Sequence, residues 1–124
     1  MTAHGLWWFA AIGLLAAQGP SGEQARNFDE KVAPILTRRC LGCHNHELDD
    51  GGISFEERAT LLRDRGERGA AVVPGNPEKS PLIWAVRHNG EIQMPPGKKL
   101  PEQEIRILTE WIEQGAVWGS KLRQ

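Results

Sequence analysis

The chain has only two cysteines, and both belong to the run Cys40-Leu41-Gly42-Cys43-His44. This is a CxxCH motif, in which the two thiols lie on one helical turn and each can add to a vinyl group of a haem. The imidazole of the next residue can then reach the iron. We therefore predict one covalently attached haem c, with Cys40 and Cys43 as the attachment residues and His44 as the proximal iron ligand.

Three other roles for the cysteine pair are open. A disulfide between them would close a loop of only a few residues and would constrain little of the unfolded chain. A thioredoxin-like dithiol is expected in a βαβ context, whereas this pair follows a helical pattern. A zinc site would need two further ligands, and His44 and His46 are too close together for a classical zinc knuckle. We favour haem attachment over all three.

Met94 is the candidate for the distal iron ligand. It lies in the run Gln93-Met94-Pro95-Pro96-Gly97. The two prolines fix φ and remove two backbone donors, so this run is expected to be an extended loop. Such a loop can present a thioether to iron, and a His/Met pair raises the reduction potential relative to two imidazoles. The alternative is that Met94 fills a gap in the core.

Two histidines compete with Met94 for the distal position. His46 is two residues from His44 and could hardly reach the opposite face of the haem. His88 precedes Asn89-Gly90 at an expected helix end, where a solvated cap residue is the simpler interpretation.

The N-terminal stretch is apolar and uncharged. The first Asp, Glu, Lys or Arg is Glu23, and residues 6–17 form a nearly unbroken apolar run. This run has the length of a signal-peptide core and is shorter than the roughly 20 residues of a membrane span. We expect residues 1–19 to be a cleaved signal peptide, which would leave no stable membrane span and a periplasmic or otherwise extracytoplasmic protein. An uncleaved interfacial anchor is the alternative.

The rest of the chain suits one small domain. We predict a linker at residues 20–26, a domain at residues 27–119 and a tail at residues 120–124. The net charge of -1 leaves no basic surplus to neutralise phosphates, so nucleic acid is not an expected partner. No combination of nucleophile, oxyanion donor and base is visible, and we expect no enzyme. The sequence does not define an oligomeric state.

Hydrophobic spacing predicts an all-α fold with about four short helices and long loops around the haem. The first helix covers residues 28–36, with Pro34 either kinking it or shortening its regular part. The others cover residues 54–63 with Ser54 as N-cap, residues 81–88 and residues 100–114. Residues 70–73 are expected to be a pocket wall, and Trp84 to contact the haem or to belong to the core.

Six runs follow one another in a characteristic order: residues 28–36, 40–44, 51–53, 73–80, 94–96 and 108–116. In this order they resemble the planctomycete-type cytochrome c domain, a branch of the class I cytochrome c superfamily. The resemblance covers about residues 28–118. It implies the cytochrome c fold, covalent haem on Cys40 and Cys43, and His44 and Met94 as axial ligands. Relatives often carry this domain within much larger exported proteins.

These observations predict one-electron transfer between redox partner proteins. Two other functions stay open. In a haem-based sensor or small-molecule binder, a ligand such as O₂ or CO would displace Met94. In an accessory module, the haem would serve mainly as a structural staple for a partner complex.

Overall fold

The computed structural model describes residues 2, 4–5 and 21–122. The expected signal peptide therefore lies outside the described residues, apart from residues 2 and 4–5. Within the described part of the chain, no helix has both the length and the apolar character needed to span a membrane.

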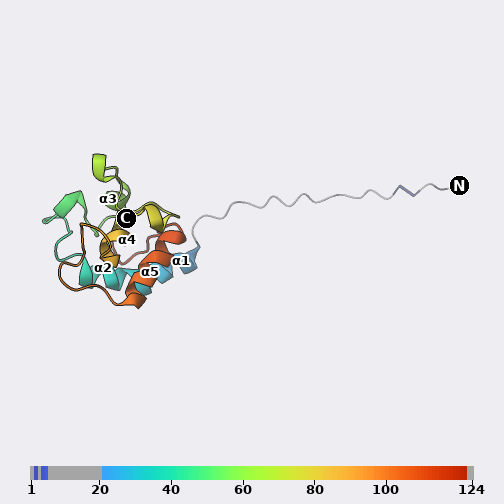
Figure 1. Cartoon of the computed structure of the whole chain (residues 1–124). Coiled ribbons are helices and arrows are strands. Elements are labelled where there is room, and N and C mark those ends of the chain that lie inside the picture. The colour runs from blue at the N-terminus through green and yellow to red at the C-terminus, as the bar shows by residue number, and fades with distance from the viewer. Residues whose placement is uncertain (1, 3, 6–20, 123–124) are drawn as a thin grey trace.

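The described residues form helices joined by loops, without a β-strand (Figure 1). The α-helices are α1 (Gly22–Asn27), α2 (Ala33–Arg39), α3 (Arg58–Leu62), α4 (Pro81–Arg87) and α5 (Glu102–Glu113). A π-helical segment, η1 (Phe28–Val32), joins α1 to α2, so residues 22–39 run as one continuous helix. Short 3₁₀ turns lie at Asp50–Gly52, Gly66–Arg68 and Pro77–Lys79. The predicted all-α fold is confirmed.

The first helix begins earlier than its hydrophobic spacing indicates. The Ser21 hydroxyl accepts from the Gln24 N–H, and the Gln24 side chain accepts from the Ser21 N–H, which makes a capping box. Most of the segment expected to be a linker, residues 20–26, is therefore helical. The irregularity expected at Pro34 takes the form of the π-helical segment just before it, because proline cannot donate to the preceding turn.

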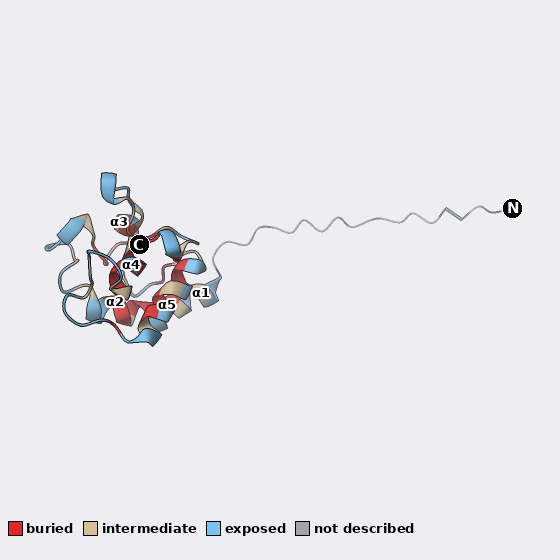
Figure 2. Cartoon of the chain, in the orientation of Figure 1, coloured by how far each residue is buried: buried red, intermediate tan, exposed pale blue. Residues whose placement is uncertain are grey.

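The core lies between this first helix and α5. Phe28 is fully buried, and its ring centroid is 5.8 Å from that of Trp111 and 4.3 Å from that of Trp118. Both indole N–H groups are satisfied, since Trp111 donates to the Val117 carbonyl at 2.8 Å and Trp118 to the Leu122 carbonyl at 3.1 Å. Figure 2 shows the buried residues on the inward-facing sides of α2, α4 and α5.

The C-terminal segment is bound to the first helix. Asp29 accepts hydrogen bonds from the N–H and hydroxyl of Ser120 and from the N–H of Lys121, at 2.8 to 3.1 Å. Partial burial acts to raise the pKa of the Asp29 carboxyl, but the hydrogen bonds from Lys121 and Ser120 outweigh it and hold the pKa below its ordinary value. The expected tail at residues 120–124 thus begins with two residues that are tied to the domain.

Replacing Gly119 by alanine is expected to lower the free energy of unfolding by about 1–3 kcal/mol. A Cβ atom at Gly119 would lie 2.6 Å from the Ala25 carbonyl oxygen and against the Asp29 carboxylate, so the segment would have to move. Gly90→Ala is the control, because a Cβ there meets nothing within 4 Å, and it should change stability by less than about 1 kcal/mol. Equal effects of the two substitutions in chemical denaturation would contradict this packing.

Two of the remaining helices agree with the sequence and one does not. Helix α4 follows Ser80 as expected, and α5 lies within the predicted residues 100–114. Helix α3, however, begins at Arg58 with Glu57 as its N-cap residue, so the prediction of Ser54 as N-cap was wrong. The Ser54 N–H instead donates to the Thr60 hydroxyl at 3.0 Å, a contact that holds Ser54 in the preceding loop.

Two expectations about apolar side chains concern residues 70–73 and Trp84. Residues 70–73 form no strand, and Ala71 and Val72 are buried. Trp84 is 45% exposed, and its indole N–H donates to the Glu78 carbonyl at 2.8 Å. Trp84 is therefore not a core residue, which was one of the two roles expected for it.

Candidate functional site

The CxxCH motif forms a turn directly after α2. The N–H groups of Cys40 and Leu41 both donate to the Leu36 carbonyl at 3.0 Å, which ends the helix. The N–H groups of Cys43 and His44 then both donate to the Cys40 carbonyl, at 3.2 and 3.0 Å. The structure thus brings the two predicted attachment residues and the predicted proximal ligand onto one turn.

The two thiols are free and differ in their surroundings. Cys43 is exposed, whereas Cys40 packs against the hydrophobic core. Burial raises the pKa of the Cys40 thiol to about 12; the Glu104 carboxylate adds to the rise and Arg39 opposes it. Redox-active dithiols work through a thiol of lowered pKa, so Cys40 does not have the character of a thioredoxin-type nucleophile.

An ion-pair group fixes α2 against α5 just before the motif. Arg38 and Arg39, the last two residues of α2, each lie 3.1 Å from a carboxylate oxygen of Glu104 on α5. Glu104 sits near the start of α5, where a negative charge also interacts well with the helix dipole. These contacts set the direction in which the chain leaves α2 and enters the turn.

His44 carries an unusual buried nitrogen. Its carbonyl accepts from the Phe55 N–H at 2.8 Å, and its ring meets the Phe55 ring edge-on with centroids 5.6 Å apart. Its Nδ1 atom is buried and has no hydrogen-bond partner among the described residues. Buried polar atoms are nearly always paired, and an exception of this kind is typical of a functional group. The imidazole therefore fits the role of an iron ligand.

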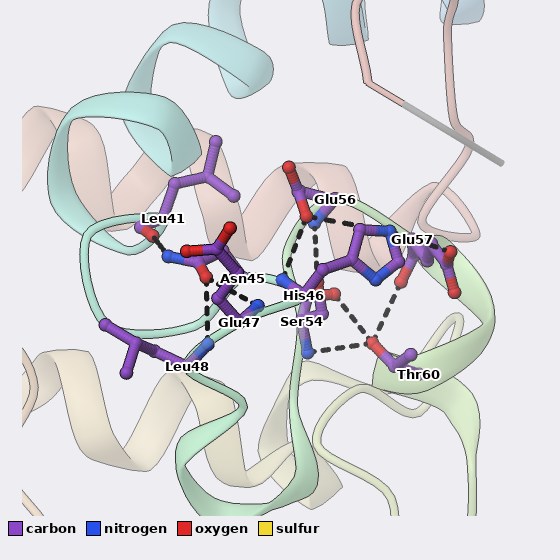
Figure 3. Close-up of polar contacts among 9 residues, drawn as sticks. All are labelled: Leu41, Asn45, His46, Glu47, Leu48, Ser54, Glu56, Glu57 and Thr60. Carbon is purple, nitrogen blue, oxygen red and sulfur yellow. Dashed lines mark hydrogen bonds and ion pairs between the residues drawn. The ribbon is translucent and has the colours of Figure 1, made fainter.

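Asn45 links the motif to the loop that follows it (Figure 3). Its side-chain amide donates to the Leu41 carbonyl at 2.7 Å, and its side-chain oxygen accepts from the N–H groups of Glu47 and Leu48 at 2.9 Å. Asn45 was not among the predicted site residues, although asparagine is a residue type that commonly makes such loop contacts.

His46 lies against two carboxylates. Its backbone N–H donates to Glu56 Oε2 at 2.9 Å, and its ring Nε2 atom is 3.1 Å from Glu57 Oε1 (Figure 3). These contacts hold His46, one of the two alternative candidates for the distal ligand, on the loop between the motif and α3. Within residues 2, 4–5 and 21–122, no group of three or more His, Cys, Asp or Glu side chains is placed to hold a metal ion.

Met94 is half-buried on a separate loop, which is attached to the end of α4. Its N–H donates to the Ala85 carbonyl at 3.0 Å, and the Met94-Pro95 peptide bond is cis. His88 is the C-cap residue of α4, as expected, but its ring is not simply solvated: Nε2 lies 3.2 Å from the Pro95 carbonyl oxygen. No pattern in the sequence indicates this contact.

The helical fold and the CxxCH turn together define a cytochrome c-like domain. Residues 40–98, just under half of the chain, match the family model described as planctomycete cytochrome C, so this segment is similar to a planctomycete-type cytochrome c domain. The matched segment begins at Cys40 and contains the turn, α3, α4 and Met94. Such a domain implies haem c as the cofactor and electron transfer as the class of function. No curated protein and no solved structure matches the chain.

Proposed function

We propose that this protein is an exported c-type cytochrome with a single haem, which carries one electron at a time between redox proteins outside the cytoplasm. The observation that carries the proposal is the Cys40–His44 turn, in which two free thiols and a histidine with an unpartnered buried nitrogen lie within the segment that matches the family. Haem c, when bound, supplies an iron that accepts and releases a single electron.

The protein's own residues attach the cofactor and complete its coordination. Cys40 and Cys43 would hold it through thioether bonds, in which each S–H has added across a vinyl double bond, an addition that has no leaving group and needs no oxidant or reductant. His44 provides the proximal imidazole, and the turn fixes the backbone on either side of it. Met94 would provide a thioether as the second iron ligand, from the loop that is bound to Ala85.

Filled axial positions separate an electron carrier from a ligand-binding sensor. A soft thioether ligand favours the reduced metal and so raises the reduction potential. It also prevents small molecules from reaching the iron unless they displace it. The same coordination requires no substrate, and it fits a function in electron transfer rather than catalysis.

The test is the visible and near-infrared spectrum of the protein matured in a host with a cytochrome c assembly system. The wild type is expected to show the sulfur-to-iron charge-transfer band of the ferric state, and Met94→Ala should lose it completely. The ferrous variant should bind CO readily and should have a lower reduction potential. Ile92→Ala is the control, because Ile92 is 60% exposed two residues before Met94 and should leave the band unchanged.

Three results would contradict the proposal. An unchanged spectrum in Met94→Ala would remove Met94 from the ligand set. Tight CO binding by the ferrous wild type, without the charge-transfer band, would favour the sensor. Failure of the holoprotein to exchange electrons with any small redox dye would favour the accessory module.

A further inference from the structure

We infer that His88 is a positioning residue that holds the Met94 loop in place for iron ligation. The inference rests on the proposed role of Met94 and adds a residue that is not itself a ligand. It depends on two observations, the hydrogen bond from His88 to the loop and the backbone conformation of His88.

The loop is bound to α4 on both sides of the Met94 side chain. On one side, the Met94 N–H donates to the Ala85 carbonyl at 3.0 Å. On the other side, His88 Nε2 lies 3.2 Å from the Pro95 carbonyl oxygen. A carbonyl oxygen can only accept, so the imidazole must donate through Nε2. The Ala85 carbonyl also accepts from the His88 N–H at 3.2 Å, so both ties converge on the last turn of α4.

The backbone of His88 adopts a conformation that glycine would adopt at lower energy. His88 has φ 55° and ψ 34°, in the left-handed region. A side chain in this region is strained, and glycine is the usual residue at such helix ends. His88 is one of two described non-glycine residues with a positive φ, and its side chain contacts the Met94 loop. Strained residues of this kind cluster at functional sites.

The hydrogen bond between His88 and Pro95 matters because most of the loop around Met94 is not packed against the rest of the protein. Residues 89–93 and 96–99 are exposed, and burial resumes only at Leu100. Pro95 directly follows Met94, and at Pro95 the side chain of the α4 C-cap residue His88 holds the loop backbone. Without that hydrogen bond the Met94 side chain would sample more positions and would leave the iron more often.

His88→Gly separates positioning from a merely structural role. Glycine relieves the left-handed strain and removes the imidazole, so the free energy of unfolding should stay the same or rise. At the same time, the charge-transfer band of the ferric holoprotein should weaken, and CO should bind the ferrous form roughly fivefold faster, as expected for the loss of one hydrogen bond. A structural role alone would leave the band and the CO rate unchanged.

Two further variants, which keep a side chain at position 88, provide a second test. Glutamine would keep an N–H donor on a long side chain, so His88→Gln should retain a CO rate close to that of the wild type. His88→Asn tolerates the left-handed region but is too short to reach Pro95, and it should behave like His88→Gly. The inference is overturned if His88→Gly has the charge-transfer band and the CO binding rate of the wild type. If His88→Gly fails to fold, the same result for His88→Asn overturns it. If Met94→Ala itself leaves the spectrum unchanged, the proposed ligation fails instead.

Discussion

Replacing both Cys40 and Cys43 by alanine is expected to leave a polypeptide from which acid-acetone extracts all of the haem. The wild type, matured in the same assembly-competent host and then denatured, should keep its colour through extraction, because thioether bonds survive the loss of the fold. The reason is the geometry of the turn, where the Cys43 N–H donates to the Cys40 carbonyl and both thiols are free. The measurement is the absorbance and mass of the extracted polypeptide.

The single variants are the control for this result. Cys40→Ala and Cys43→Ala each keep one thiol, so each should retain one covalent bond and a coloured polypeptide. Only the double variant should lose the haem completely. A colourless wild type whose sulfurs titrate as thiols, or are paired with each other, would contradict haem attachment and with it the proposed function.

Phe28→Ala is expected to lower the free energy of unfolding of the holoprotein by about 3–5 kcal/mol. Phe28 is fully buried against Trp111 and Trp118, so truncation leaves a cavity at the contact between the first helix and α5. The aromatic contacts are lost as well, and the total is a large part of the stability of a domain of this size. Chemical denaturation followed by Trp fluorescence and haem absorbance measures the change.

Trp84→Ala is the matched control, since it removes a larger aromatic ring from a site that is 45% exposed. It loses one hydrogen bond, from the indole to the Glu78 carbonyl, and it leaves no enclosed cavity, because the ring is open to solvent on one side. We expect a loss of about 1 kcal/mol. If the two substitutions destabilise the protein equally, Phe28 does not occupy the centre of the core.

Local signals in the sequence were sufficient for the turn and for two helices. The CxxCH spacing places its residues on one turn because their N–H groups reach the Cys40 carbonyl. Proline at the start of α4 and Gly115 just after α5 mark the ends of those helices through fixed backbone preferences. The positions of such residues depend on neighbours a few residues away, which a sequence pattern records.

The features that were missed depend on side-chain contacts that no local sequence pattern encodes. Ser54 has the residue type of an N-cap, but its contact with Thr60 holds it in a loop and moves the start of α3 to Arg58. The tie between Asp29 and Ser120 joins residues 91 positions apart. The contact of His88 with Pro95 depends on how one loop folds back on α4. None of these contacts leaves a periodic or motif-like trace in the sequence.

The bond between Asp29 and Lys121 has a consequence for how the domain can be combined with others. Asp29 lies eight residues after Ser21 on one continuous helix, which corresponds to about 12 Å. The entry and exit points of the domain are therefore neighbours. A larger protein could contain this whole domain within one of its surface loops without moving the two ends of that loop apart. This architecture is therefore suited to domain insertion.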